Sequence, residues 1–265
     1  MRPASVPPYI QINQKPASWF LSNISSTRMK LAKLNSGKTQ VSIVIPAYNE
    51  QESILRTIAS IADTITDYSI ELIVVDNNST DLTKQYIIES GAKYVFEPKP
   101  GVENARTAGL NFASGKYVIS ADADTIYSPY WVNELIAPLA TDENIAISHG
   151  KFAFVPEYYN RFTLYLYELT GDVFKKINGL NKDSAMYVYG CSSAYRRDQV
   201  LAVNAYEHPV GANEDGYLAL KLRDKFGRIH KVRSKKSFAW TSSRKFLADG
   251  SLLQRIKNKA SKILS

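Results

Sequence analysis

Two apolar runs near the start of the chain most constrain what it can fold into. Residues 41–45 read Val-Ser-Ile-Val-Ile, and residues 70–75 read Ile-Glu-Leu-Ile-Val-Val. Runs of this kind are typical of strands that are buried on both faces of a parallel sheet. Between them, Ile54, Ile58 and Ile61 recur at the spacing of a helix. A strand, a helix and a second strand in this order predict a right-handed unit of a parallel sheet.

The same alternation continues along the chain and predicts further elements. The pattern predicts helices over residues 50–65, 80–89, 102–113 and 214–226, and another helix that starts near Pro129. It predicts strands over residues 92–96, 116–120, 145–148 and 187–196, and a strand or hairpin over residues 228–240. We therefore expect an α/β fold with a mostly parallel central sheet flanked by helices. No Pro/Gly linker separates the two halves, so they are expected to share one sheet.

The two ends of the chain differ from this central part. Residues 1–40 hold four prolines in their first sixteen positions and show little periodicity, so they are interpreted as an extension of a domain at residues 41–248. Residues 249–265 are predicted to form a basic amphipathic helix, with an apolar stripe that includes Leu252, Ile256 and Ile263. Such a helix either lies on an anionic membrane or packs on the domain with a solvated basic face.

Composition excludes several classes of protein. The chain has 265 residues and a formal net charge of +8, which suits nucleic acid, an anionic membrane or a phosphorylated substrate as partner. The single cysteine, Cys191, allows no internal disulfide and no cysteine-based zinc site. No apolar run is long enough to span a bilayer, and the first residues lack the apolar core of a secretory signal. These features predict a cytoplasmic protein, peripheral at the inner face of the membrane if the terminal helix binds lipid.

Polar segments follow three of the predicted strands, where ligands of open parallel sheets bind. Asn78, Ser79 and Thr80, after the second strand, could alternatively just turn the chain and cap the next helix. Three polar strand ends together nevertheless favour a site for nucleotide phosphates. The candidate binding residues at these strand ends are Pro46, Ala47, Tyr48, Glu50, Asp76, Asp122, Ala123 and Asp124.

Asp122 and Asp124 are separated by one small residue directly after a predicted strand. Carboxylate oxygens in this arrangement suit Mg²⁺ or Mn²⁺, which are commonly held by one or two carboxylates together with substrate phosphates. The glycine-rich phosphate loops of dinucleotide-binding dehydrogenases and of P-loop NTPases are both absent. The sequence therefore predicts a metal and phosphate site of another kind.

These segments together resemble the nucleotide-sugar half of the family-2 glycosyltransferases. Gly101 and the segment Ala105-Arg106-Thr107-Ala108-Gly109 resemble another motif of that family, with Thr107 in place of its usual asparagine. The resemblance spans residues 41–244. It implies a GT-A fold and the inverting transfer of a sugar from a nucleotide-diphosphate donor, with a UDP-sugar as the expected donor.

The resemblance also implies roles for individual residues. Pro46, Ala47, Tyr48 and Glu50 would line the nucleotide pocket, and Asp76 would accept a hydrogen bond from uracil. Asp122 would face the ribose and the metal, and Asp124 would bind the metal that bridges the diphosphate. Arg106 would lie near the nucleotide, and Arg244 or Lys245 would contact the phosphates.

The reaction itself requires one more group. A metal can neutralise the leaving diphosphate, so no general acid is needed, but the attacking hydroxyl must lose its proton to a base. Glu214 and Asp215 open a predicted helix and resemble the family's Glu-Asp pair, which implies that Asp215 is the base and Glu214 contacts or orients the acceptor. The alternative is a purely structural pair of favourable charges at a helix N-terminus.

The acceptor is expected to be a glycan or a lipid-linked saccharide that binds near residues 190–193. Cys191 is interpreted as a packed residue, and His230 as a core or surface residue. The Gln-x-x-Arg-Trp motif of processive relatives is absent, which favours transfer of a single sugar. Nucleic acid is not an expected partner.

Two alternative functions remain open. A sugar nucleotidyltransferase should carry a glycine-rich loop after the first strand, and a non-catalytic sugar-nucleotide- or nucleic-acid-binding protein would not need both acidic pairs.

Overall fold

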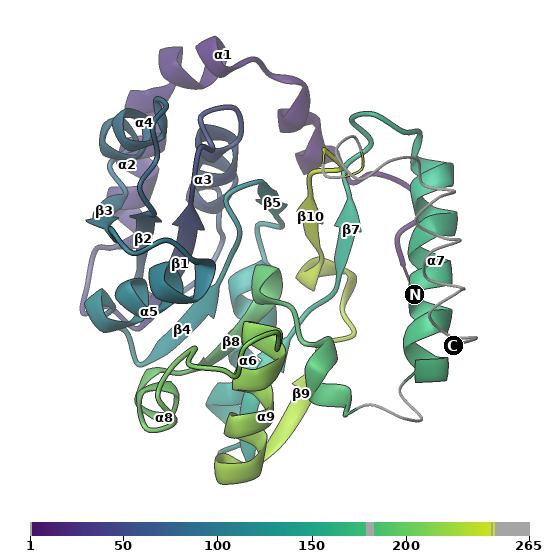
Figure 1. Ribbon diagram of the computed structural model, residues 1–265. Helices are drawn as coiled ribbons and strands as arrows, with labels where there is room; N and C mark the ends of the chain where they lie inside the picture. Colours follow the sequence, from purple (N-terminus) through teal and green to yellow (C-terminus); the bar gives the residue numbers. More distant parts are fainter. Residues whose placement is uncertain (1, 179–182, 245, 247–265) are drawn as a thin grey trace.

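A seven-stranded sheet in the order β3-β2-β1-β4-β8-β6-β9 forms the centre of the protein (Figure 1). The computed structural model describes residues 2–178, 183–244 and 246. Within this sheet only β8 runs antiparallel to its neighbours, so the predicted mostly parallel sheet shared by both halves is confirmed. The strands are β1 (Val41–Ala47), β2 (Ile70–Asp76), β3 (Lys93–Phe96), β4 (Tyr117–Ser120), β6 (Ile145–His149), β8 (Ser193–Arg196) and β9 (Arg228–Lys231).

Helices cover both faces of the sheet because its inner strands are apolar on both sides. In β1, Ile43 and Ile45 belong to the core under one set of helices, whereas Val44 belongs to the core under the other set. The first set comprises α3 (Ile54–Ala62), α4 (Thr83–Ser90) and α6 (Trp131–Thr141). The second set comprises α5 (Val102–Phe112), α8 (Arg197–Leu201) and α9 (Glu214–Phe226).

Close packing at Gly109 brings α5 down onto the sheet. A β-carbon at this position would overlap the side chains of Val44 and Val75. Arg106 lies about one turn earlier on the same helix and is 3% exposed. The glycine therefore lets α5 approach β1 and β2 closely enough to bury Arg106 behind the carboxyl ends of the strands.

A second, three-stranded sheet and a long helix stand beside the main sheet (Figure 1). The strands are β5 (Thr125–Tyr127), β10 (Ala239–Thr241) and β7 (Phe152–Phe154), and the helix is α7 (Arg161–Asn178). The helical spacing of Phe162, Leu166, Leu169 and Val173 in the sequence predicts core packing by default, but the side chains of Phe162, Leu166 and Val173 are exposed. The buried side of α7 instead carries Leu164 and the ion-paired Glu168.

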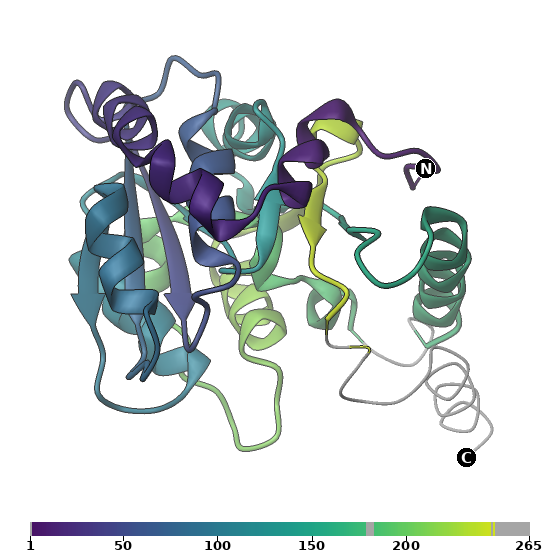
Figure 2. The same cartoon turned by 90° about the horizontal axis from the view of Figure 1, so that it is seen from above.

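The N-terminal segment folds into helices that its sequence pattern did not predict. These are the 3-10 helix η1 (Pro8–Gln14), α1 (Ala17–Ser22) and α2 (Ile24–Leu34), which cross the top of the molecule (Figure 2). They are short, and each contributes only one buried hydrophobic side chain, Ile10, Phe20 and Leu31. Phe20 packs against Leu55 of α3, which joins this segment to the helical layer.

Three other predictions of secondary structure were wrong in part. The strand predicted over residues 187–196 is confined to β8, because two 3-10 helices, η2 (Ser184–Tyr187) and η3 (Gly190–Ser192), precede it. The strand or hairpin predicted over residues 228–240 is divided between β9 and β10, which belong to different sheets and are separated by η4 (Lys235–Ser237). Helix α3 begins four residues later than expected.

The predicted amphipathic helix at residues 249–265 lies outside the described residues. Within residues 2–178, 183–244 and 246, no helix has the length and apolar character that crossing a membrane requires.

Acid should weaken the fold through Glu71, a β2 residue whose side chain is only 2% exposed. Burial alone would raise its pKa, but hydrogen bonds from Lys93, Ser42 and Ser114 lower it from 4.5 to about 2. The stabilisation is therefore complete above pH 4.5 and lost as the pH falls towards 2. We expect the free energy of unfolding to fall over this range by up to about 3 kcal/mol more in the wild type than in Glu71→Gln. Denaturant unfolding at several pH values measures this difference. The same pH dependence of the unfolding free energy in the wild type and in Glu71→Gln would contradict it.

Candidate active site

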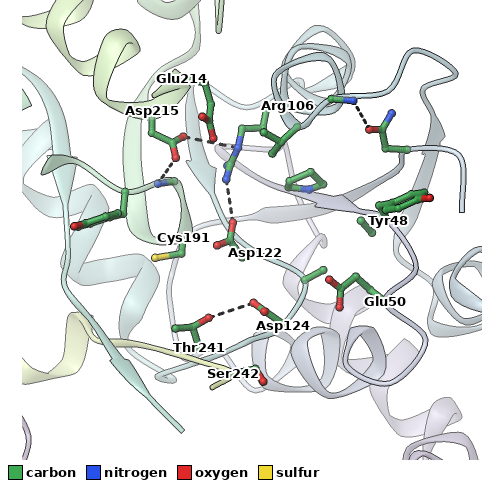
Figure 3. Close-up of a pocket in the computed structure, with 18 of the residues that line it drawn as sticks. Tyr48, Glu50, Arg106, Asp122, Asp124, Cys191, Glu214, Asp215, Thr241 and Ser242 are labelled. Carbon is green, nitrogen blue, oxygen red and sulfur yellow. Dashed lines mark hydrogen bonds and ion pairs between the residues drawn. The ribbon is translucent and has the colours of Figure 1, made fainter. Parts of the chain in front are cut away.

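A cavity of about 1030 Å³ opens at the carboxyl ends of β1, β2 and β4. One wall consists of the segments that follow these strands and includes Pro46, Ala47, Tyr48 and Glu50. The opposite wall comes from β7, β10 and the segment around Gly190. Most of the predicted site residues line this one cavity, although they are far apart in the sequence (Figure 3).

Hydrogen bonds join the loop after β1 to the loop after β2. Asn49 accepts a hydrogen bond from Thr80 N at 2.9 Å, and its own N–H donates to Ser79 Oγ at 3.0 Å. Asn49 and Asn78 both have left-handed backbone conformations, with φ of 52° and 70°. Tyr48 is 60% exposed beside this junction, so its ring is available to a ligand.

Asp76, which the family resemblance assigns to uracil, does not line the cavity. Its side chain is 2% exposed and accepts hydrogen bonds from Ser79 N at 2.9 Å and from the Tyr94 hydroxyl at 3.2 Å. Its neighbours Asn77 and Asn78 line the cavity instead. Asn77 binds the carbonyl oxygens of Glu97 and Lys99, which holds the loop after β3 against the site.

Asp122 and Asp124 both line the cavity, but their hydrogen bonds run in different directions (Figure 3). Asp122 Oδ1 accepts from Arg106 Nη2 at 2.9 Å, whereas Asp124 Oδ1 accepts from Thr241 Oγ1 at 3.2 Å. The second oxygen of Asp124, Oδ2, is buried without a hydrogen-bond partner. The carbonyl of Ala123 accepts from Thr57 Oγ1 at 2.8 Å and fixes the loop to α3.

Arg244 lies beside the same carboxylates. Its guanidinium hydrogen bonds to Glu50, and Nη2 lies 3.6 Å from Asp124 Oδ2. Burial raises the pKa of Glu50, and the Arg244 charge opposes that rise. The positively charged guanidinium group of Arg244 therefore lies close to the buried oxygen of Asp124. Lys245, the other residue predicted to contact phosphates, lies outside the described residues.

Asp215 lies on the other side of the cavity, at the second residue of α9. The helix is capped by Asn213, whose side chain accepts from Gly216 N at 2.7 Å. Asp215 Oδ2 accepts from Gly190 N at 2.7 Å, and its Oδ1 lies 3.7 Å from Arg106 Nε. Burial raises the pKa of Asp215, while Arg106 opposes the rise. Glu214 lines the cavity next to it.

Arg106 joins the two acidic groups from within the protein. Its buried guanidinium faces both Asp122 and Asp215 (Figure 3). It also hydrogen bonds to the Ser120 hydroxyl. Burial disfavours the charged form, but Asp215 and Asp122 hold the pKa of Arg106 above its usual value. The sequence predicted only that Arg106 lies near the nucleotide. In the structure its side chain links Asp122, after β4, to Asp215, at the start of α9.

A family model confirms the resemblance seen in the sequence. The model, described as "Glycosyl transferase family 2", matches residues 42–201. The chain belongs to glycosyl transferase family 2.

Curated relatives of this family-2 member match parts of its length. Glucosyl-3-phosphoglycerate synthase of Mycobacterium tuberculosis is 35% identical over 127 residues, which cover 44% of this chain and 39% of that protein. An uncharacterized glycosyltransferase of Haemophilus influenzae is 27% identical over 182 residues, which cover 66% of this chain and 55% of that protein. The match therefore spans about two fifths of the first relative and just over half of the second.

Solved structures show the same fold. The M. tuberculosis synthase in complex with Mn²⁺, uridine diphosphate and phosphoglyceric acid has a TM-score of 0.59 to this protein at 23% identity. The match covers 91% of this chain and 82% of that chain. The same enzyme has been solved with Mn²⁺, UDP-glucose and glycerol 3-phosphate, with a TM-score of 0.56 at 24% identity. The fold of this family-2 glycosyltransferase is the GT-A fold.

Sequence reasoning missed several residues of the cavity. Phe152, Phe154, Tyr189 and Thr241 form much of the wall opposite the loops after β1 and β2. The alternation Phe-Ala-Phe at residues 152–154 was a possible signal, because it places both rings on one side of a strand. Cys191 also lines the cavity; it is 7% exposed, and burial raises the pKa of its thiol, as expected of a packed residue rather than a nucleophile.

His230 lies in β9 and lines a different pocket on the far part of the main sheet. Within the described residues, no three His, Cys, Asp or Glu side chains are grouped closely enough to hold a metal on their own.

Gly190 leaves room for the contact between Asp215 and Arg106. A β-carbon at this position would overlap Arg106 Nη2 and both carboxylate oxygens of Asp215. We expect Gly190→Ala to lower the transfer rate by about 100-fold, because small displacements of reacting groups cost this much, while UDP affinity stays nearly unchanged. Gly171→Ala on α7 is the matched control, since no atom lies within 4 Å of its added β-carbon. A Gly190→Ala protein as active as the control would contradict this prediction.

Proposed function

We propose that this protein is a metal-dependent, inverting glycosyltransferase that moves one sugar from a UDP-sugar to a hydroxyl group of an acceptor. One observation carries the proposal. A single cavity holds Asp122 and Asp124 at the end of β4 and Asp215 at the start of α9, with the buried Arg106 between them. This arrangement supplies the two functions that the reaction needs, which are retention of a diphosphate and removal of a proton.

The donor is assigned from the family and from the nucleotide wall of the cavity. The M. tuberculosis synthase was solved with Mn²⁺ and UDP-glucose, which makes UDP-glucose the first donor to test. Tyr48 offers an exposed ring, and the adjoining loops after β1 and β2 are held together by Asn49, Ser79 and Thr80. Because Asp76 is 2% exposed and does not line the cavity, base recognition through its side chain would require the loop after β2 to rearrange.

The carboxylates after β4 fit Mn²⁺ or Mg²⁺. The buried Oδ2 of Asp124 has no hydrogen-bond partner, so a bound cation would satisfy it. In this proposal Asp124 and Asp122 would hold the ion together with the phosphates of the donor. When bound, the ion neutralises the negative charge of the diphosphate. Arg244 would then shift from Asp124 and Glu50 towards the phosphates, where a guanidinium binds well.

Asp215 would act as the base in one displacement. The acceptor oxygen forms a bond to the anomeric carbon while the bond from that carbon to the diphosphate oxygen breaks. The hydroxyl proton passes to Asp215, and the electron pair of the broken bond leaves with UDP. Attack opposite the leaving group inverts the anomeric centre. Burial strengthens Asp215 as a base because it raises the pKa, and Arg106 keeps the carboxylate ionised.

The acceptor in this proposal is a glycan or a lipid-linked saccharide that enters beside Gly190 and Tyr189. Its hydroxyl would lie near Asp215, on the wall formed by β7 and the segment before β8. Peripheral membrane contact through residues 249–265 stays a prediction, because those residues lie outside the described structure.

Calorimetry tests the donor assignment. We expect UDP to bind more tightly than GDP or dTDP, and Mn²⁺ to strengthen its binding. Failure of all three nucleotides to bind would refute the proposed function. Transfer is then followed as UDP release in a donor screen that begins with UDP-glucose, and UDP binding without any release in the presence of acceptors would favour a non-catalytic binding protein.

A further inference from the structure

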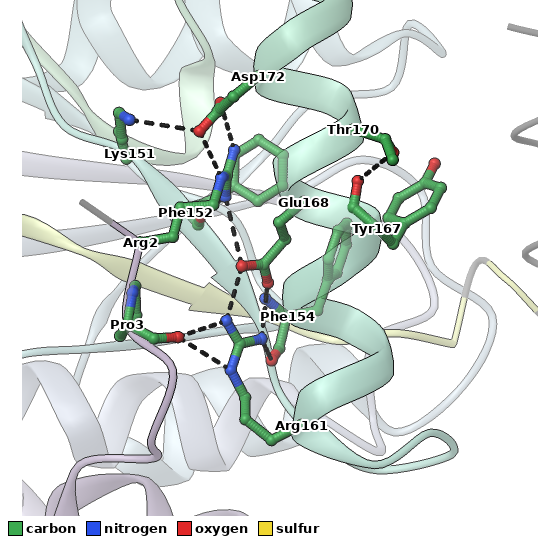
Figure 4. A network of polar contacts seen from close by, with 10 residues as sticks. All are labelled: Arg2, Pro3, Lys151, Phe152, Phe154, Arg161, Tyr167, Glu168, Thr170 and Asp172. Atoms are coloured by element: carbon green, nitrogen blue, oxygen red, sulfur yellow. Dashed lines mark hydrogen bonds and ion pairs between the residues drawn. The ribbon is translucent and has the colours of Figure 1, made fainter. Parts of the chain in front are cut away.

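Four basic side chains gather where α7 faces β7 and the end of the main sheet. We call Arg2, Lys151, Lys175 and Lys231 the cationic cluster. Lys175 is influenced by the charges of the other three, and Lys231 by those of Lys151 and Arg2. Figure 4 shows Arg2 and Lys151 converging on Asp172 of α7, beside the ring of Phe152.

The carboxylates near the cationic cluster are already engaged. Asp172 accepts from Arg2 Nε at 2.8 Å and Nη2 at 2.9 Å, and from Lys151 Nζ at 3.4 Å. Glu168 accepts two hydrogen bonds from Arg161, at 2.7 and 2.6 Å (Figure 4). Within the described part of the chain, neither Lys175 nor Lys231 forms an ion pair with a carboxylate. The cluster therefore carries positive charge that the protein does not neutralise.

This uncompensated charge is unfavourable without a ligand. Burial and then the charge of Arg2 lower the pKa of Lys175 to about 8. Burial and then the charge of Lys151 also lower the pKa of Lys231. Lowered values of this kind mean that the protein destabilises the charged lysines, and an anion placed among them would reverse the effect.

The position of Lys175 connects the cationic cluster to the acceptor side of the cavity. Its Nζ lies 4.2 Å from the ring centroid of Tyr189 and 5.9 Å from that of Phe152. Both rings line the cavity. Tyr189 precedes Gly190, whose N–H donates to Asp215 Oδ2. One aromatic residue thus separates the proposed base from the unpaired ammonium group.

We infer that the acceptor carries a phosphate group next to its reactive hydroxyl, and that Lys175 and Lys231 bind this phosphate. The inference rests on the proposed function, because it treats the wall around Tyr189 and Gly190 as the acceptor side. Arg2 and Lys151 support the site electrostatically while they remain bound to Asp172. The phosphate belongs either to a small soluble acceptor or to the diphosphate of a lipid-linked sugar.

Titration with inorganic phosphate tests the site directly. The protein is first saturated with UDP and Mg²⁺, so that the probe cannot occupy the donor site. We expect saturable phosphate binding, weakened about tenfold or more in the Lys175→Gln/Lys231→Gln double variant, because charge-assisted hydrogen bonds are lost. Lys175→Arg should retain binding. Lys236→Gln is the matched control, since Lys236 Nζ lies 4.4 Å from the ring centroid of Tyr130, away from the cluster.

Two results would overturn the inference. One is the absence of phosphate binding to the wild type; the other is equal binding by the double variant in a form whose thermal unfolding shows that it is folded. Failure of the wild type to bind UDP contradicts the proposed function instead. In that case phosphate is titrated into the free protein, and the wild type is compared with the same variants.

Transfer assays then identify the source of the phosphate. UDP-glucose is supplied with phosphoglyceric acid or with glyceric acid, and separately with vesicles of phosphatidylcholine that hold, or lack, a polyprenyl-diphosphate-linked sugar. Use of phosphoglyceric acid supports a soluble acceptor, and use of the lipid-linked sugar supports a membrane-borne one. Equal transfer above background to glyceric acid and phosphoglyceric acid would overturn the inference, as would use of neither phosphoglyceric acid nor the lipid-linked sugar.

Discussion

Replacing Asp215 by asparagine should leave UDP and metal binding intact and reduce sugar transfer by about 10²- to 10⁴-fold, the contribution expected of a general base. The amide oxygen can still accept the hydrogen bond from Gly190 N, so the local backbone should keep its shape. What the variant loses is the ability to take a proton. Calorimetry with UDP and Mn²⁺ measures binding, and release of UDP in the presence of donor and acceptor measures transfer.

The pH profile separates a base from a structural carboxylate. Because burial raises the pKa of Asp215, wild-type transfer should fall as the pH decreases through that raised value and be fully present above it. In the asparagine variant this acidic limb should disappear from the residual rate. Asp224→Asn, near the other end of α9 in an exposed ion pair with Arg223, is the matched control. Full activity of Asp215→Asn would assign the base to another residue.

Asp124→Asn should remove the dependence of UDP binding on metal and slow transfer by about 100-fold or more, since a metal supplies several kcal/mol of charge stabilisation. The buried Oδ2 is the position that changes, because an amide nitrogen there cannot bind a cation. The hydrogen bond from Thr241 to Oδ1 can remain. UDP titrations with and without Mn²⁺ show whether the two curves of the variant coincide.

Asp63→Asn provides the comparison for this experiment, because Asp63 forms an exposed ion pair with Lys30 away from the cavity. Its UDP binding should respond to Mn²⁺ as in the wild type. A metal response that persists in Asp124→Asn would place the ion elsewhere, and Asp122→Asn would then be measured in the same way.

The central sheet could be predicted from the sequence, because the residues that favour strands are also the residues that the fold buries. The runs at residues 41–45 and 70–75 are apolar on both sides, and only a position between two helical layers satisfies them. The N-terminal helices could not be predicted in this way. Their stability comes from a few contacts, such as Phe20 against Leu55, rather than from a periodic apolar stripe. In α7 the periodic stripe was misleading, because the inner side carries Leu164 together with the ion-paired residues Glu168 and Asp172 instead.

Within the site, the residues that follow β1 and β4 and those that open α9 were predicted to act together, and the structure places them in one cavity. Their connection through Arg106 was not predictable from spacing, since it depends on the burial of α5 against the sheet at Gly109. The aromatic wall was missed for a related reason. Phe152 and Tyr189 meet at a ring-centroid distance of 5.1 Å, and Tyr189 directly precedes η3, where a strand was expected.

The ion pair between Arg2 and Asp172 has a consequence for the order in which the protein is built. The two residues are 170 positions apart, and closing so long a loop carries a large entropic cost before the contact can form. Strands β1 to β4, by contrast, pair within a short stretch of chain. During synthesis β1 to β4 can assemble first, while Arg2 lacks its carboxylate partners Asp172 and Glu168 until α7 emerges. The contacts between the N-terminal segment and α7 are therefore among the last of the described contacts that can form as the chain is made.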